Sequence, residues 1–119
     1  MKPIPYLSLL TGVLLFGGVL GASQACAADV DVSALWSKNC ASCHGKDGKG
    51  DTKAGKMKDV KDLTDPKIQA DFSRDKMIQT VKEGIKDEKT GKERMKAFDG
   101  KLDDTQIGAL VDWVIALKP

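Results

Sequence analysis

Aromatic side chains are scarce in this chain of 119 residues, where phenylalanine, tryptophan and tyrosine make up 5%. Four of them lie beyond residue 28: Trp36, Phe72, Phe98 and Trp113. A domain of about 90 residues buries a modest core and is marginally stable alone. Four aromatics are few for such a core, so we expect another large apolar group to complete it.

Histidine and cysteine are rarer still. The chain has one histidine, His44, and three cysteines, Cys26, Cys40 and Cys43. A structural zinc site needs four protein ligands, and the residues after position 28 supply two cysteines and one histidine. This count excludes a structural zinc site.

A long hydrophobic run is also missing. Residues 7–20 are apolar but shorter than the roughly 20 residues that span a bilayer, and small residues follow as far as Ala28. This order predicts a secretory signal peptide over residues 1–28 and one mature domain over residues 29–119. An uncleaved membrane anchor is the alternative. The sequence before Cys26 loosely resembles a lipoprotein cleavage site, so we expect membrane attachment only if Cys26 carries a lipid.

No stretch alternates apolar and polar residues for long enough to predict a β-strand. Apolar residues recur instead at helical spacing, so we predict an all-α domain. Helices are expected over residues 32–39, 66–70, 73–84 and 103–117. A glycine-rich turn is expected over residues 45–51, a flexible lysine-rich loop over 52–61 and an exposed loop over 86–96.

The last helix has the clearest pattern. Asp103 and Gln106 are placed almost as a capping box, and one apolar stripe follows them: Ile107, Leu110, Val111, Val114 and Leu117. We expect this helix to cross the first one, with Trp36 and Trp113 near the crossing.

Charge is nearly balanced but unevenly placed. Beyond residue 28 there are 18 basic and 17 acidic residues, whereas residues 38–61 alone hold seven lysines and three aspartates. Most lysines are expected to be simply solvated, but this segment could also steer an acidic partner. The basic residues are diluted by acids and have no aromatics between them, so we expect no nucleic-acid binding.

The residues Cys40-Ala41-Ser42-Cys43-His44 form a Cys-x-x-Cys-His motif, which is typical of c-type haem attachment. Two thiols add to the two vinyl groups of the porphyrin, and the histidine follows at the position of the proximal iron ligand. A thioredoxin-like dithiol would need a strand before the motif and a βαβ unit around it. A disulfide between Cys40 and Cys43 would be strained and would leave His44 idle.

The second axial ligand of the iron cannot be another histidine of this chain. Met77 lies on the apolar stripe of a predicted helix and is expected in the core. Met57 follows His44 by thirteen residues, which is a short length of chain for reaching the other face of the porphyrin. Met95 follows His44 by fifty-one residues and is our predicted distal ligand, with Met57 or an open site as alternatives.

With these motifs the chain from Ser33 to Leu117 resembles a small bacterial class I cytochrome c. The resemblance also rests on segments 62–66 and 95–98 and on the start of the last helix. It implies a cytochrome c fold, with short helices and loops wrapped around one covalent haem and with His44 and Met95 on its iron. Members commonly have Met-Pro and Gly-Pro where this chain has Met95-Lys96 and Gly55-Lys56.

We therefore predict a monomeric periplasmic electron carrier, not an enzyme, which passes single electrons between redox partner proteins. The first alternative is a haem protein with a weak or open sixth position that binds a gas or peroxide. The second is a haem subunit of a larger dehydrogenase.

Overall fold

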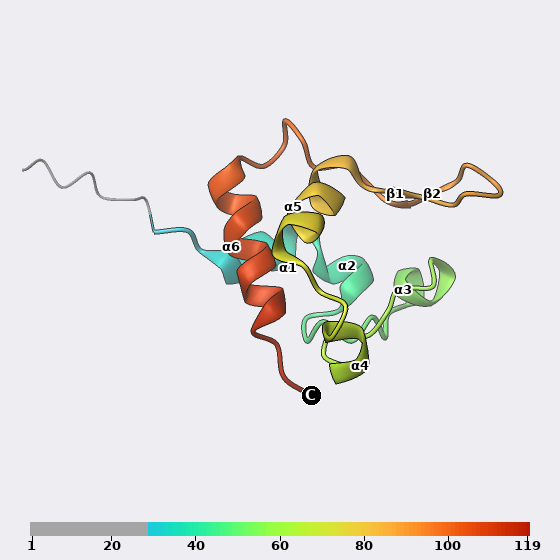
Figure 1. The fold of residues 1–119 in the computed structure, drawn as a ribbon, viewed down its shortest axis with the longest axis horizontal. Helices are drawn as coiled ribbons and strands as arrows, with labels where there is room; N and C mark the ends of the chain where they lie inside the picture. Colours follow the sequence, from blue (N-terminus) through green and yellow to red (C-terminus); the bar gives the residue numbers. More distant parts are fainter. Residues whose placement is uncertain (1–28) are drawn as a thin grey trace, which may run out of the picture.

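The computed structural model describes residues 29–119 (Figure 1). The predicted signal peptide and Cys26 lie outside this range. Within it the helices are α1 Val32–Asn39, α2 Ala41–His44, α3 Lys53–Met57, α4 Pro66–Gln69, α5 Arg74–Glu83 and α6 Asp104–Ile115. Two short strands, β1 Ile85–Lys86 and β2 Glu93–Met95, form an antiparallel hairpin between α5 and α6. None of the helices in residues 29–119 is both long enough and apolar enough to cross a membrane.

The helix ends follow from local chemistry. The Asp31 carboxylate accepts a hydrogen bond from the Ala34 N–H at 2.9 Å, which begins α1. The predicted box at α6 is complete, because Asp103 accepts from the Gln106 N–H and the Gln106 side chain accepts from the Asp103 N–H. Ser73 precedes α5 as expected, but its side chain makes no capping hydrogen bond.

The described residues are mostly helical, as predicted, but the exposed loop expected over residues 86–96 contains strand residues of a short hairpin. Strands of two and three residues are too short to show an alternating pattern, and their side chains are mostly polar and exposed. The turn between them is held by the Asp87 carboxylate, which accepts from the N–H groups of Lys89 and Thr90. The hairpin extends away from the helices in Figure 1.

The lysine-rich segment 52–61 is also more ordered than predicted, because it contains α3. Thr52 caps this helix by accepting a hydrogen bond from the Gly55 N–H at 2.8 Å. The threonine is a normal capping residue. Five helical residues, however, are too few to show an apolar stripe.

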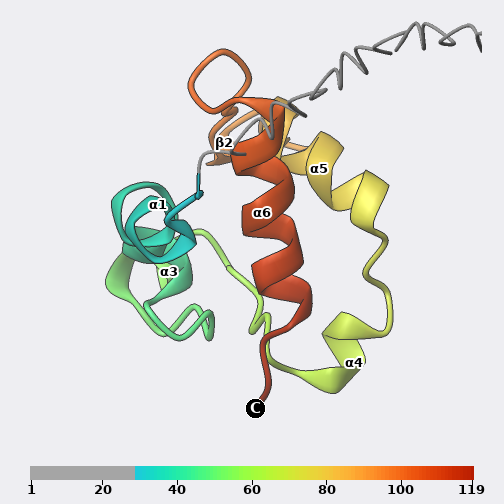
Figure 2. The same ribbon diagram turned by 90° about the vertical axis from the view of Figure 1, so that its left-hand side faces the viewer.

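The core lies where α6 packs against α1 and α5 (Figure 2). Trp36 of α1 is buried together with Leu110 and Val114 of α6. The Trp36 and Trp113 rings are 4.5 Å apart between centroids, which confirms that these side chains meet between α1 and α6. The predicted stripe of α6 is buried except for Leu117, which is partly exposed.

The apolar stripe of α5 is not buried in the same way. Met77, Ile78 and Val81 are partly exposed, and Ile85 is 42% exposed. Three of them, Met77, Val81 and Ile85, line a cavity between α5 and the Cys40–His44 segment. The stripe therefore faces a space that protein side chains do not fill.

Candidate functional site

The first wall of the site is the turn that carries Cys40, Cys43 and His44. Cys40 ends α1, and the next four residues form α2. The Trp36 indole N–H donates to the Gly45 carbonyl at 2.9 Å, and the Trp36 and His44 rings are 5.7 Å apart. This buried hydrogen bond attaches the residue after His44 to α1, so the core holds the motif in place.

The segment after the motif folds back over it. The Gly50 N–H donates to the His44 carbonyl at 2.7 Å, and the Thr52 hydroxyl donates to the Cys43 carbonyl at 2.8 Å. Gly55 packs so closely here that an added Cβ would collide with the carbonyl oxygens of Gly50 and Cys43. Glycine is therefore required at position 55 for lack of space.

The second wall carries Met95. In the hairpin register Met95 lies opposite Ile85, directly after α5. The Phe98 N–H donates to the Val81 carbonyl at 3.0 Å, which attaches the segment after Met95 to α5. Gly84 ends α5 with φ of 74°, a conformation that favours glycine. Its α-carbon faces the backbone of residues 95–97.

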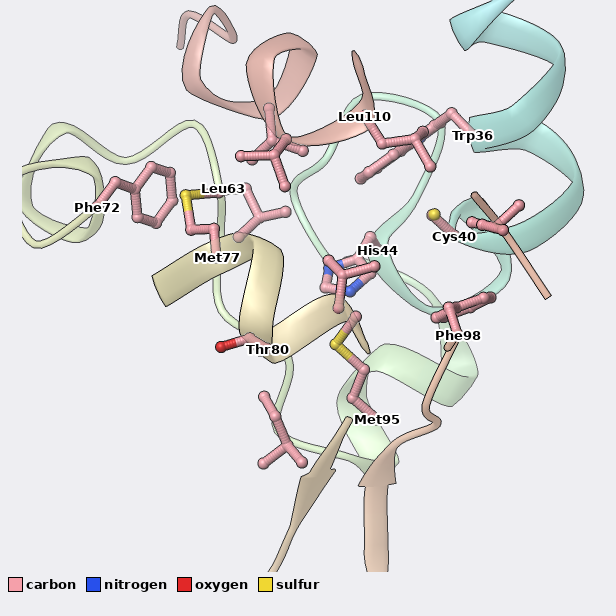
Figure 3. Close-up of a pocket in the computed structure, with 15 residues that line it drawn as sticks. Trp36, Cys40, His44, Leu63, Phe72, Met77, Thr80, Met95, Phe98 and Leu110 are labelled. Carbon is pink, nitrogen blue, oxygen red and sulfur yellow. The ribbon is translucent and has the colours of Figure 1, made fainter. Parts of the chain in front are cut away.

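The two walls enclose a cavity of about 210 Å³, beside a wider opening of about 520 Å³. Cys40, His44 and Met95 line both spaces. Figure 3 shows the His44 ring and the Met95 sulfur projecting into the cavity from α2 and from β2. The other side chains around the smaller cavity are apolar, apart from Trp36 and Thr80.

Burial changes the ionisation of the polar groups at this cavity. It lowers the pKa of His44 from 6.5, so the imidazole stays neutral and able to ligate a metal. It raises the pKa of the Cys40 thiol to about 11, against a smaller opposing effect of Lys96. Both cysteines are free thiols in this structure.

Nδ1 of His44 is buried and has no hydrogen-bond partner. A buried nitrogen without a partner is costly, and an imidazole that binds a metal through one nitrogen normally donates from the other. An apolar cavity with a neutral imidazole on one wall, a thioether on the other and free thiols at its edge fits a covalently attached haem.

The three methionines of the described chain differ in position. Met57 is 80% exposed and lines neither space, so it does not face the site. Met77 packs against the core as predicted, but it also lines the smaller cavity, which the sequence did not indicate. Met95 lines both spaces together with His44.

Some of the basic residues at the site were expected from the sequence and others were not. Lys58, Lys61, Arg94 and Lys96 line the wider opening. Lys58 and Lys61 belong to the lysine-rich segment 38–61, which was expected to steer an acidic partner. Arg94 and Lys96, by contrast, belong to the region that was predicted as an exposed loop. Thr52 was likewise missed, although a threonine before a short helix is a capping signal.

Known proteins resemble this chain in sequence family and in fold. Residues 27–114 match the family described as cytochrome c oxidase, cbb3-type, subunit III. The solved structure of KustC0563, a c-type cytochrome, is 27% identical and aligns with a TM-score of 0.63 over 76% of this chain and 100% of its own. A tyrosine-to-phenylalanine mutant of that protein is 30% identical, with a TM-score of 0.64 over 75% of this chain and 100% of its own.

No curated protein sequence matches the chain. Cys40 and Cys43 fit the haem attachment motif of c-type cytochromes, whose role is electron transfer. The chain therefore belongs to the family described as cytochrome c oxidase, cbb3-type, subunit III, and it is a small monohaem cytochrome with covalently bound haem c.

Proposed function

We propose that this protein is an exported carrier of single electrons with histidine and methionine as axial ligands. Cys40 and Cys43 hold the haem by thioether bonds, His44 is the proximal ligand and Met95 the distal ligand. One observation carries this proposal: residues that are fifty-one positions apart line the same apolar cavity. Bound haem supplies an iron that alternates between the ferrous and ferric states.

The residues of the chain have separate tasks in this proposal. His44, kept neutral by burial, presents a nitrogen to the metal. Met95 presents an uncharged sulfur, which favours the state of lower charge and so raises the reduction potential. Phe98 and Leu110, both buried, help to exclude water from the cavity.

We further propose that α1 crosses α6 and that the segments between them wrap the haem, as in class I cytochromes c. The protein acts in the periplasm as a monomer and meets its redox partners at the exposed haem edge. Lys58 and Lys61 line the wider opening. Their position supports a basic docking rim that an acidic partner meets in a small, short-lived complex.

The ligand assignment is tested by comparing Met95→Leu with Met77→Leu in the haem-loaded protein. Both changes remove a thioether from the cavity wall at nearly constant volume. The oxidised wild type should show the red-region charge-transfer band of methionine on iron, and Met95→Leu should lose this band and bind carbon monoxide readily when reduced. Met77→Leu should keep the band. A wild type that binds carbon monoxide readily would instead support the open-site alternative.

A further inference from the structure

We propose that Arg94 is a positioning residue, which holds the Met95 strand against the segment that follows α3 and thereby keeps the methionine on the iron. This inference rests on the proposed ligation by Met95. It assigns a task to a side chain that lies next to the ligand and does not itself reach the metal.

The Arg94 guanidinium contacts two consecutive residues, Lys58 and Asp59, which come directly after α3. Nε and Nη2 donate to the Lys58 carbonyl at 3.2 and 3.1 Å. Nη2 also donates to the Asp59 carbonyl at 3.0 Å and to its carboxylate at 3.2 Å. We call this set of contacts the Arg94 bridge. The Arg94 side chain is 37% exposed, so part of the bridge is shielded from solvent.

The carbonyls of Lys58 and Asp59, at the end of α3, need a hydrogen-bond donor from outside the helix. The last carbonyls of a helix have no partner within the helix, and Lys58 is the C-terminal cap of α3. Asp59 has φ of 51°, the left-handed conformation that a non-glycine residue seldom adopts. The bridge therefore supplies hydrogen-bond donors to the carbonyls at the end of α3. It also fixes the turn at Asp59 in its left-handed conformation.

The choice of arginine is informative in this chain. Of its 19 basic residues only two are arginines, Arg74 and Arg94. Arg74 makes a forked contact with both oxygens of Asp112, at 2.6 and 3.0 Å. The structure thus has arginine where one side chain contacts several acceptors at once. A lysine ammonium is a point charge and holds several acceptors with less directional control.

The bridge joins the two walls of the site. Other contacts that hold the Met95 segment come from Val81 of α5 and from Gly84 and Ile85, which follow that helix. Segment 58–59, by contrast, follows α3, which packs against the α2 helix that carries His44. Without the bridge the hairpin should separate more often from the His44 wall, and a larger fraction of molecules would have the distal position open.

The experiment measures imidazole binding to the oxidised, haem-loaded protein, because imidazole competes with the distal ligand for the iron. Arg94→Gln should bind imidazole about tenfold more tightly, because loss of the bridge opens the distal position in a larger fraction of molecules. Tenfold corresponds to about 1.4 kcal/mol. The charge-transfer band of Arg94→Gln should weaken. Arg94→Lys should restore only part of the wild-type behaviour, and Asp59→Asn, which keeps both carbonyls, should change the affinity less than about threefold.

Arg74→Gln is the matched control, because it removes the other forked arginine contact and Arg74 does not line the cavity. We expect it to lower the free energy of unfolding without changing imidazole affinity. The inference is overturned if Arg94→Gln binds imidazole like the wild type, or if Arg74→Gln raises the affinity equally. A shift of the reduction potential alone would also overturn it, since Arg94 would then act on the haem carboxylates. If the wild type and Met95→Leu bind imidazole equally well, the ligand proposal itself fails.

Discussion

The close contact between Gly84 and the Met95 segment leads to a prediction for Gly84→Ala. It separates the backbone strain that an added methyl group causes from the overlap of that group with the Met95 segment. A Cβ built on Gly84 would lie 2.5 Å from the Met95 carbonyl oxygen and 2.8 Å from the Ala97 nitrogen. Both are backbone atoms, so no side-chain rotation relieves the overlap. Gly84→Ala should therefore displace the strand that carries the proposed ligand.

Two costs add in this variant. An L-residue at φ of 74° and ψ of −173° loses about 1–3 kcal/mol, and overpacking a close contact loses about 1–3 kcal/mol more. Gly91 is the matched control, because it has φ of 68° and an added Cβ there meets nothing within 4 Å. We expect a total loss of about 2–6 kcal/mol for Gly84→Ala and about 1–2 kcal/mol for Gly91→Ala.

The assay is guanidinium denaturation of the haem-loaded protein, followed by the charge-transfer band of the oxidised form. Gly84→Ala should lower the free energy of unfolding more than Gly91→Ala does and should weaken the band. Gly91→Ala should keep the band unchanged. Equal losses of stability with an intact band in both variants would refute the argument from close packing.

Three further predictions concern the motif and the surface. Trp36→Phe removes the buried donor to the Gly45 carbonyl and should lower the free energy of unfolding, measured by urea denaturation, by about 1–3 kcal/mol. A loss of stability no larger than that of Trp113→Phe would contradict this prediction. Because burial lowers the pKa of His44 from 6.5, any acid transition of the Soret spectrum should be centred below that pH. A transition centred at pH 6.5 or above would oppose it. Raising the salt concentration from 0.1 to 1 M shortens the Debye length from about 10 to about 3 Å and should slow electron transfer to an acidic partner, whereas rates independent of salt would disprove steering by residues 38–61.

The helices with strong local signals were predicted well. The bounds of α1 and the capping box of α6 follow from single residues and their spacing, so no tertiary information is needed. The contact between Trp36 and Trp113 was also foreseen, because each tryptophan lies on the apolar side of its helix. Cys40, Cys43 and His44 form a contiguous motif, which makes their joint position a matter of local chain geometry.

The hairpin and α3 could not be read in the same way. Their few residues are mostly polar, and their order comes from contacts with distant segments, such as the Arg94 bridge to Lys58 and Asp59. The partial exposure of the α5 stripe has a related cause. A pattern of apolar residues shows which face is buried but not whether protein or haem covers it, and here Met77 and Val81 line the cavity.

The most direct measurement is the mass of the purified protein, made in a host that matures c-type cytochromes and analysed under denaturing conditions. The account predicts one haem that stays bound to the peptide containing Cys40 and Cys43 after unfolding, and it predicts a chain that begins near Asp29. A colourless product with the mass of the bare polypeptide would contradict it.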